Sequence, residues 1–242
     1  VTGSRSDNGT KRPPDKIRGA VVPHHLLAHA LIEEVFDHLR ADPAPLVVLI
    51  GPNHFNKGGK ILTSSWGWQT PFGTVDADKD GVDWLLGLTS VKEDPEVFKE
   101  EHSMGNLMPF IKYYLPEARV VPIILHHDVS PQEARQLANR LSHLEDSGAV
   151  ILASVDFSHY LTREQAEEKD AETLKVLESG NTGRLFTMDN DYIDSPASLG
   201  TLLYAMEGLG IDGFTLLGNT NSGVILKNDL IETTSYMTLL LK

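Results

Sequence analysis

Histidines gather after the short apolar runs of this chain. The sequence has ten His, and six of them lie in the few residues that follow such a run: His24, His25, His54, His126, His127 and His159. Neutral imidazoles combined with carboxylates are typical of metal sites. Two His and one carboxylate leave open positions on Fe(II), and three protein ligands with a water suit catalytic zinc. The residue types therefore indicate a metal site, provided that the fold brings these segments together.

Two motifs place a carboxylate close to an imidazole. Asp156 and His159 are three residues apart, where the acid could orient the ring or accept a proton. Glu101 directly precedes His102, ahead of a predicted helical stretch over 104–114, and two interpretations stay open: Glu101 or Ser103 caps this helix, or the segment takes part in catalysis. Ser158 lacks the flanking glycines of a nucleophile elbow, so a serine hydrolase is not expected.

Local sequence suggests how other candidates are presented. Gly51 and Pro52 predict a turn directly after an apolar run, which would present Asn53 and His54 at the edge of a sheet. His25 and His29 are four residues apart, a spacing that places both on one helix face, where we expect them to be solvated. The acid-rich run from 164 to 172 is most simply a solvated helix face.

The elements that must position these residues are apolar runs alternating with helical segments. The runs are 17–22, 46–50, 119–125, 149–155, 214–217 and 235–241. Near-continuous apolar runs predict strands buried on both faces, and alternation with helices predicts a single three-layer α/β domain with a largely parallel central sheet. The carboxyl ends of parallel strands share one edge, where ligands collect. We therefore expect the histidines to meet there.

The helices carry clear start signals. Ser130 with Glu133 and Thr162 with Gln165 have the spacing of capping boxes, which predicts helices to about residues 144 and 178. Ser195-Pro196 predicts a third helix that ends near Gly208. The segment 61–78 is interpreted as a β-hairpin. Residues 1–16 have the composition of a flexible arm, which leaves 17–242 as one domain.

Composition excludes several classes of protein. Lys plus Arg is 21 and Asp plus Glu is 34, a net charge of −13 that disfavours nucleic acid and anionic lipid as partners. The chain has no Cys, which excludes disulfides, Cys-ligated zinc and thiol nucleophiles. No apolar run is long enough to span a membrane, and we expect a cytoplasmic protein. Its oligomeric state is not indicated.

Taken in order, the motifs resemble those of the Memo family, whose bacterial and archaeal members are also called AmmeMemoRadiSam system protein B. They are more distantly similar to the catalytic subunit of class III extradiol ring-cleaving dioxygenases. The matching blocks are VVPHH (21–25), LIGPNHF (49–55), TPFGTVDAD (70–78), EHSMGNLMPFI (101–111), VVPIIL (120–125), ILASVDFSHY (151–160) and NSG (221–223). The resemblance implies one α/β domain with its site at the edge of the sheet.

The resemblance also implies roles for individual residues. It places a divalent metal on His24 and His54, with His102, His159 and Asp156 beside the open face of the metal as candidate catalytic groups. Asn53, Glu101 and Ser158 are the candidate substrate-binding residues. A third metal ligand is not evident around 221–224, where this chain has neither carboxylate nor Cys, and the candidates are Glu101, Asp156 and His127.

Three functions stay open at this stage. The first is a dioxygenase-like oxidoreductase with Fe(II), for which Zn and Cu are alternatives, acting on a small molecule. The second is a non-catalytic scaffold that binds a peptide or a small anion in the same pocket, without need of a metal. The third is a metal-dependent hydrolase, because zinc-activated water would also suit a cluster of His and Asp.

Overall fold

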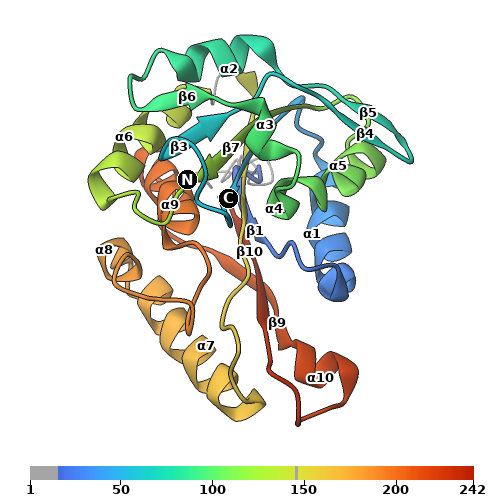
Figure 1. The fold of residues 1–242 in the computed structure, drawn as a ribbon, viewed down its shortest axis with the longest axis vertical. Coiled ribbons are helices and arrows are strands. Elements are labelled where there is room, and N and C mark those ends of the chain that lie inside the picture. Colours follow the sequence, from blue (N-terminus) through green and yellow to red (C-terminus); the bar gives the residue numbers. More distant parts are fainter. Residues whose placement is uncertain (1–15, 145–146) are drawn as a thin grey trace, which may run out of the picture.

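A mixed β-sheet forms the centre of the molecule (Figure 1). The computed structural model describes residues 16–144 and 147–242. In this part of the chain eight strands form one sheet in the order β6-β3-β7-β2-β8-β1-β10-β9, and β4 pairs with β5 separately. The strands are β1 (Gly19–Val22), β2 (Leu46–Pro52), β3 (Ile61–Thr63), β4 (Trp68–Thr70), β5 (Gly73–Val75), β6 (Val91–Glu93), β7 (Arg119–Leu125), β8 (Val150–Ser154), β9 (Thr215–Asn221) and β10 (Ser235–Leu241).

The middle of the sheet is parallel. β7, β2, β8 and β1 run in the same direction, whereas β10 and β9 continue the sheet antiparallel beyond β1. The four parallel strands are almost wholly buried, as expected for strands covered on both faces. Their carboxyl ends therefore lie at one edge of the sheet.

Helices cover both faces of the sheet. They are η1 (Leu26–Ala28), α1 (His29–Ala41), α2 (Lys79–Leu86), α3 (Pro95–Phe98), α4 (His102–Gly105), α5 (Met108–Tyr114), α6 (Pro131–Ser142), α7 (Arg163–Glu178), α8 (Thr182–Leu185), α9 (Pro196–Gly208) and α10 (Ser222–Leu226). α6 and α9 lie over one face, and α1, α4 and α5 over the other. The predicted three-layer α/β fold is confirmed.

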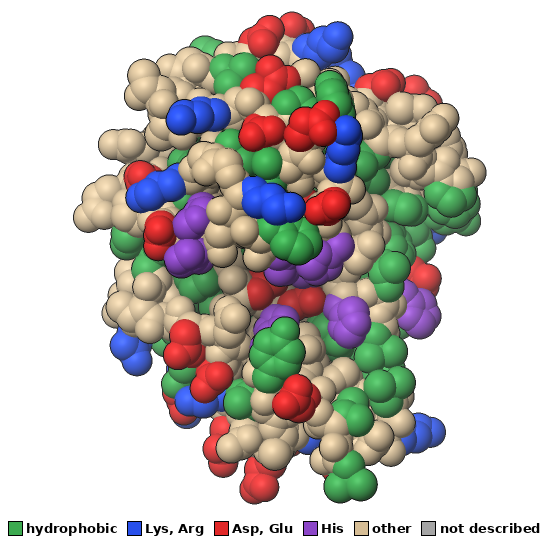
Figure 2. Space-filling view, viewed as in Figure 1, with side chains coloured by type: hydrophobic (Ala, Val, Ile, Leu, Met, Phe, Trp, Pro, Cys, Tyr) green, Lys and Arg blue, Asp and Glu red, His purple; other side chains and the backbone are tan. Residues whose placement is uncertain are grey.

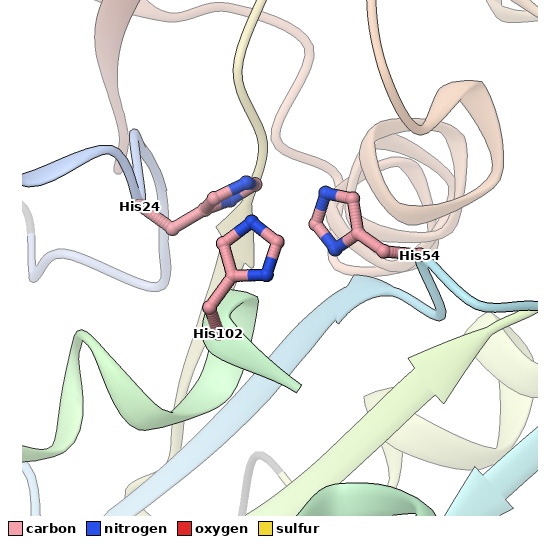
Figure 3. A group of neighbouring side chains, drawn as sticks. All are labelled: His24, His54 and His102. Atoms are coloured by element: carbon pink, nitrogen blue, oxygen red, sulfur yellow. The ribbon is translucent and has the colours of Figure 1, made fainter. Parts of the chain in front are cut away.

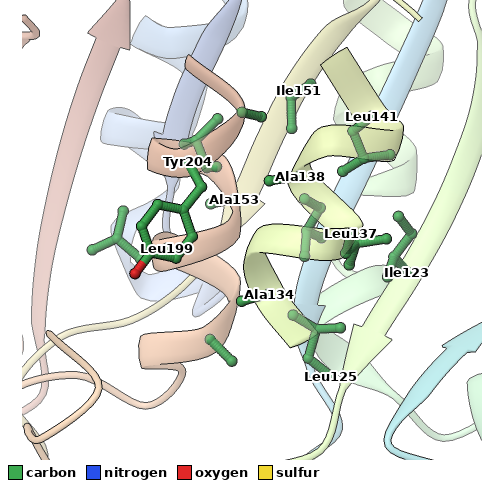
Figure 4. Close-up of a cluster of buried hydrophobic side chains, with 14 of the residues drawn as sticks. Ile123, Leu125, Ala134, Leu137, Ala138, Leu141, Ile151, Ala153, Leu199 and Tyr204 are labelled. Atoms are coloured by element: carbon green, nitrogen blue, oxygen red, sulfur yellow. The ribbon is translucent and has the colours of Figure 1, made fainter. Parts of the chain in front are cut away.

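α6 and α9 pack against the sheet and against each other, and α6 does so through small side chains. Ala134 and Ala138 of α6 and Leu199 of α9 are fully buried against strand residues that include Ile123 and Ala153 (Figure 4).

The predicted capping box of α6 is present, since the Ser130 hydroxyl accepts from the Glu133 N–H and the Glu133 carboxylate accepts from the Ser130 N–H. That of α7, between Thr162 and Gln165, is present as well.

Four local predictions need correction. β2 does not end at residue 50 but continues through Gly51 and Pro52, so the turn begins at Asn53. The segment 61–78 is only partly a hairpin: Ile61–Thr63 joins the main sheet beside β7, where the Thr63 hydroxyl donates to the Pro122 carbonyl. His25 precedes η1, whereas His29 begins α1, so they do not share a helix.

The fourth correction concerns the helical stretch 104–114, which is two helices. α4 ends at Gly105, and α5 begins at Met108 with a proline in its first turn. Proline has no N–H and suits the start of a helix rather than its interior, which explains the break. The proposed arm lies, apart from residue 16, outside the described residues, and the domain boundary stays a prediction. None of the described helices is both long and apolar enough to cross a membrane.

Candidate metal centre

Adjacent strands deliver the candidate ligands to one rim. His24 follows β1, His54 follows β2 and Asp156 follows β8, which lies between β1 and β2 in the sheet. His102 does not follow a strand but is the first residue of α4. Segments more than a hundred residues apart in sequence therefore meet at the carboxyl edge of the parallel strands, as the sequence predicts.

Three imidazole rings point toward one another (Figure 3). Nitrogen atoms of His24, His54 and His102 all lie within 4.8 Å of one another, close enough to hold a metal ion. The His24 ring stands nearly perpendicular to the other two, at 84° to His54 and 81° to His102. His54 and His102 are instead stacked, with ring centroids 4.0 Å apart at 28°. His24 is buried, whereas the His102 side chain is 48% exposed.

Hydrogen bonds determine which nitrogen of His24 faces the site. The Ser154 hydroxyl donates to the Ser103 carbonyl at 2.7 Å, so its lone pairs accept from His24 Nδ1 at 3.2 Å. The proton therefore sits on Nδ1, and Nε2 keeps a free lone pair. Burial lowers the pKa of His24 well below its usual value, and the neighbouring His54 and His102 lower it further. His24 is consequently neutral and available as a metal ligand.

Glu101 holds His54 in the corresponding way. Its carboxylate accepts from His54 Nδ1 at 2.7 Å and from the His54 backbone N–H at 2.9 Å, and it also caps α4 by accepting from the Ser103 N–H at 3.0 Å. Burial would raise the pKa of Glu101, but the hydrogen bond from His54, the electrostatic interaction with its ring and the two backbone donors lower the pKa to about 2. The ionised carboxylate therefore directs His54 Nε2 toward the site. Glu101 is both a cap and a positioning residue.

Two carboxylates form the floor of the site. Asp194 Oδ2 lies 3.4 Å from His24 Nε2 and 3.9 Å from His54 Nε2, and Asp156 Oδ2 lies 3.5 Å from His24 Nε2. Their side chains are 7% and 4% exposed. Burial raises the pKa of Asp156, and burial together with the charge of Asp156 raises that of Asp194 well above its usual value. A cation placed among these groups would offset both effects.

Asp194 Oδ1 is buried without a hydrogen-bond partner in the described part of the chain. The loop that carries Asp194 is joined to the Asp156 loop by the Asp194 N–H, which donates to the Asp156 carbonyl at 3.1 Å, and by the Asp156 N–H, which donates to Asp194 Oδ2 at 3.2 Å. A buried polar atom left unpaired is costly, so it points to a missing ligand. The donor set thus fits a metal ion.

His159 completes the group of site residues. Its backbone N–H donates to the Asn190 carbonyl at 3.0 Å, and its Nδ1 is buried with no partner among the described residues. Burial lowers the pKa of His159, opposed by the charge of Asp156. Burial and the nearby His54 also lower the pKa of His102. Both rings are therefore suited to accept a proton near neutral pH.

Other predicted residues lie elsewhere or are engaged. His127 stacks on His126 and pairs with Asp128, a separate and more exposed group. Ser158 is fully buried and donates to Asp170 at 2.8 Å. Asn53 folds its own turn by donating to the Lys57 carbonyl at 2.7 Å. Substrate contacts by Ser158 and Asn53 stay predictions.

Sequence reasoning missed Asp194. The residue stands immediately before Ser195-Pro196, where the sequence signals only the start of a helix. A search of the carboxylates in the C-terminal part for the missing third ligand would have included it, but nothing in its neighbourhood distinguishes it from Asp189 or Asp191. Asp194 is distinguished only in the structure, where its loop pairs with the segment that contains Asp156.

Comparisons with known proteins agree with the resemblance. A family model described as "Memo-like protein" matches residues 4–239. A MEMO1 family protein of Methanosarcina mazei is 33% identical over 229 residues, which cover 90% of this chain and 84% of that protein. One from Caldivirga maquilingensis is 29% identical over 250 residues, covering 97% and 86%. The crystal structure of an uncharacterized protein from Escherichia coli K12 superposes with a TM-score of 0.64 over 93% of this chain and 99% of that chain, and at 13% identity it shows the fold alone.

Proposed function

The chain belongs to the Memo-like protein family, and from this premise we propose that it is a metal-dependent oxidoreductase with Fe(II) bound by His24, His54 and Asp194. Two His and one carboxylate form the ligand set of non-haem iron enzymes that keep open positions for substrate and oxygen. The observation that carries the proposal is the approach of Asp194 Oδ2 to the free Nε2 atoms of both histidines.

The spacing of these atoms supports the proposal. Two ligand atoms bound at about 2.1 Å on one face of an octahedral ion lie about 3.0 Å apart. The separations from Asp194 Oδ2 are 3.4 Å to His24 Nε2 and 3.9 Å to His54 Nε2, so movements of less than about 1 Å would complete the coordination. The other ring nitrogen of each His is also held, since His24 Nδ1 donates to Ser154 and His54 Nδ1 donates to Glu101, an arrangement common around metal-binding His.

Asp194 fits the third position better than the other candidates. The lone pair of an imidazole lies in the plane of its ring, so two nearly parallel stacked rings such as His54 and His102 do not aim at one close point. Glu101 uses its carboxylate on His54 and the cap of α4. His127 belongs to the separate His126 and Asp128 group. Among the described ion pairs Asp156 Oδ2 approaches only His24, whereas Asp194 Oδ2 approaches both His24 and His54.

When bound, the ion would supply Lewis acidity and, as iron, redox chemistry toward oxygen. The surrounding residues hold and move protons. His159 and His102, neutral because burial lowers their pKa values, accept a proton from a hydroxyl of the substrate. The Asp156 carboxylate accepts from the His24 backbone N–H, and its negative charge favours the protonated form of His159. The reaction class consistent with this arrangement is oxidation of a small phenolic molecule such as a catechol. A cytoplasmic location stays a prediction.

Metal analysis of untagged protein tests the ligand assignment. After anaerobic reconstitution with Fe(II) and removal of free ion, we expect about one iron per chain in the wild type, measured by mass spectrometry of the metal. Asp194→Ala and His54→Ala remove a ligand and should lose most of the iron. His102→Ala should retain it, and so should His127→Ala, the control outside the site.

The two parts of the proposal fail separately. Iron content of Asp194→Ala equal to that of the wild type, with loss in His102→Ala, would assign the third position to His102 instead. Iron-loaded wild type that consumes no oxygen with any catechol would contradict the oxidoreductase assignment while leaving the metal site in place.

A further inference from the structure

We propose that the cavity beside the metal centre selects ligands with a positive charge on the side away from the metal and disfavours anionic ones. This inference rests on the proposed function and deepens it, because it names the substrate class of the same site. The preference concerns the charge on the part of the ligand that lies away from the metal, not the group that faces the metal.

The cavity opens directly on the metal centre. It has a volume of about 800 Å³, and its wall includes His54, His159 and Asp194. Figure 2 shows a hollow in this face with carboxylates at its floor and histidines around it. A volume of this size accommodates a small organic molecule. A ligand held at the metal would therefore extend along the remaining wall.

That wall is acidic. Asp128, Asp189 and Asp191 line it in addition to Asp194, and none of the described lining residues is Lys or Arg. Asp128 pairs with His127 at 3.0 Å. An anion in this cavity would meet like charges without a lysine or arginine in the described wall to compensate them.

The nearest lysines in sequence are engaged elsewhere. Lys57 pairs with Glu100 at 3.3 Å and lies over the Phe55 ring. Lys60 pairs with Glu133 at 3.1 Å. Lys169 donates to the Tyr192 hydroxyl at 2.8 Å. The contacts of Lys57 and Lys60 hold their ammonium groups on partners outside the cavity lining. Lys169 also interacts with the charge of Asp191 and offsets part of it, whereas Asp128, Asp189 and Asp194 have no lysine or arginine partner among the described ion pairs.

An aromatic ring adds a second feature that favours a cation. Tyr160 lines the cavity and is 69% exposed. Its φ of 58° lies in the left-handed region, which is uncommon for a residue with a side chain and fixes the direction in which the ring leaves the backbone. The face of an exposed Tyr ring attracts ammonium groups and stacks on aromatic ones. The wall thus suits an aromatic ligand with an amine.

Three catechols that differ in one substituent and its charge test the charge preference. They carry an ethylamine, an ethyl or a propanoate substituent at the same ring position, so the metal-facing diol is constant. Binding to the iron-loaded full chain is measured by calorimetry without oxygen, which prevents turnover. We expect the amine to bind about tenfold more tightly than the propanoate at low salt, with the ethyl compound between them, and the difference to shrink as salt screens the charges.

A double variant that neutralises part of the wall makes the test specific. Asp189→Asn with Asp191→Asn removes two carboxylates that line the cavity. The Asp189 side chain accepts from the backbone N–H of residue 191 at 3.2 Å, and the amide oxygen introduced by the first substitution can still accept this bond. This double variant should reduce the ratio between the affinities for the amine and the propanoate severalfold. The control, Asp83→Asn with Glu117→Gln, removes two exposed acids outside the cavity and should leave the difference unchanged.

The outcomes separate this inference from the proposed function. Equal or tighter binding of the propanoate, or a difference that the wall variant and the control change alike, would overturn the charge preference while showing that catechols bind. No binding of any of the three would overturn the proposed function, and this inference with it.

Discussion

Glu101 decides which nitrogen of His54 can bind a metal. Its ionised carboxylate accepts from Nδ1 at 2.7 Å, which leaves Nε2 free for the ion. Glu101→Gln keeps the shape of the side chain and an acceptor for the cap of α4, but it removes the charge. We expect metal affinity to fall about 10- to 100-fold, the usual effect of losing such a partner. Competition with a chelator measures the affinity.

The neighbouring residue offers a matched control for this prediction. Glu100 is exposed and pairs only with Lys57 among the described ion pairs. Glu100→Gln should therefore leave the metal affinity unchanged. If the two variants bind metal equally well, Glu101 serves the helix cap and not the orientation of His54.

Residue types and local spacing identify most of the site, but not all of it. His24 and His54 follow parallel strands, so a regularity of the fold fixes their meeting place. Asp194 stands in the irregular loop before α9, and it reaches the site because that loop pairs with the segment after β8. Such a contact between distant loops leaves no periodic signal, which is why Asp194, the proposed third ligand, could not be predicted from the sequence.

Among the elements, α7 has a buried face that its acid-rich composition does not predict. The composition favours a solvated face, yet Asp170 is buried. Ala166, Asp170, Thr173 and Leu177 are the buried residues of this helix, and their spacing follows one helical face. Asp170 accepts from the hydroxyls of Ser158 at 2.8 Å and Ser235 at 2.5 Å, so it joins α7 to the site loop and to β10.

This buried carboxyl makes the attachment of α7 dependent on pH. Burial raises the pKa of Asp170 from 3.8 to about 6, despite the hydroxyl donors that lower it. A carboxyl whose pKa is raised in the folded state makes its full contribution to stability below about pH 4, and this contribution is lost as the pH rises through about 6. The free energy of unfolding changes by about 3 kcal/mol over this range. Asp170→Asn cannot ionise and still accepts from both hydroxyls.

We therefore expect Asp170→Asn to gain stability relative to the wild type between pH 4 and pH 6, where the difference in free energy of unfolding should grow with pH. Urea unfolding at several pH values measures this difference, and contributions of other groups cancel in it. Glu168→Gln, on the exposed face in the middle of the same helix, is the control and should not show this growing difference from the wild type. Parallel curves for Asp170→Asn and the wild type would show that Asp170 does not titrate in this range.

The regular elements are more predictable than the loops. The strands 119–125 and 235–241 have the bounds expected from their apolar runs, because continuous burial on both faces leaves a clear pattern. Ile61–Thr63 has only three residues, too few to tell a hairpin strand from a strand of the main sheet. Its pairing with β6 and β7 is what makes it part of the sheet. Short strands depend on partners that the local sequence does not reveal.

For the molecule as a whole, the proposed metal centre lies where distant segments of the chain meet and the buried carboxylates of Asp156 and Asp194 lie close together. It brings together the ends of β1 and β2, the loop before α9 and, through Glu101, the start of α4. In the metal-free protein, Asp156 and Asp194 are buried next to each other, which raises the pKa of Asp194. A bound ion stabilises the folded state only, because the unfolded chain does not assemble these ligands.

We therefore expect the melting temperature to rise with metal concentration. At an ion concentration about 100 times the dissociation constant the gain is about 2.7 kcal/mol, which corresponds to about 5–10 °C for a chain of this length. The gain should decrease as the pH falls, since protons compete for the ligands. Calorimetric scans with added Fe(II) or with chelator measure it. Asp194→Ala should show little of this dependence, whereas His127→Ala should match the wild type; an equal rise in both variants would mean that the ion stabilises the protein from some other place.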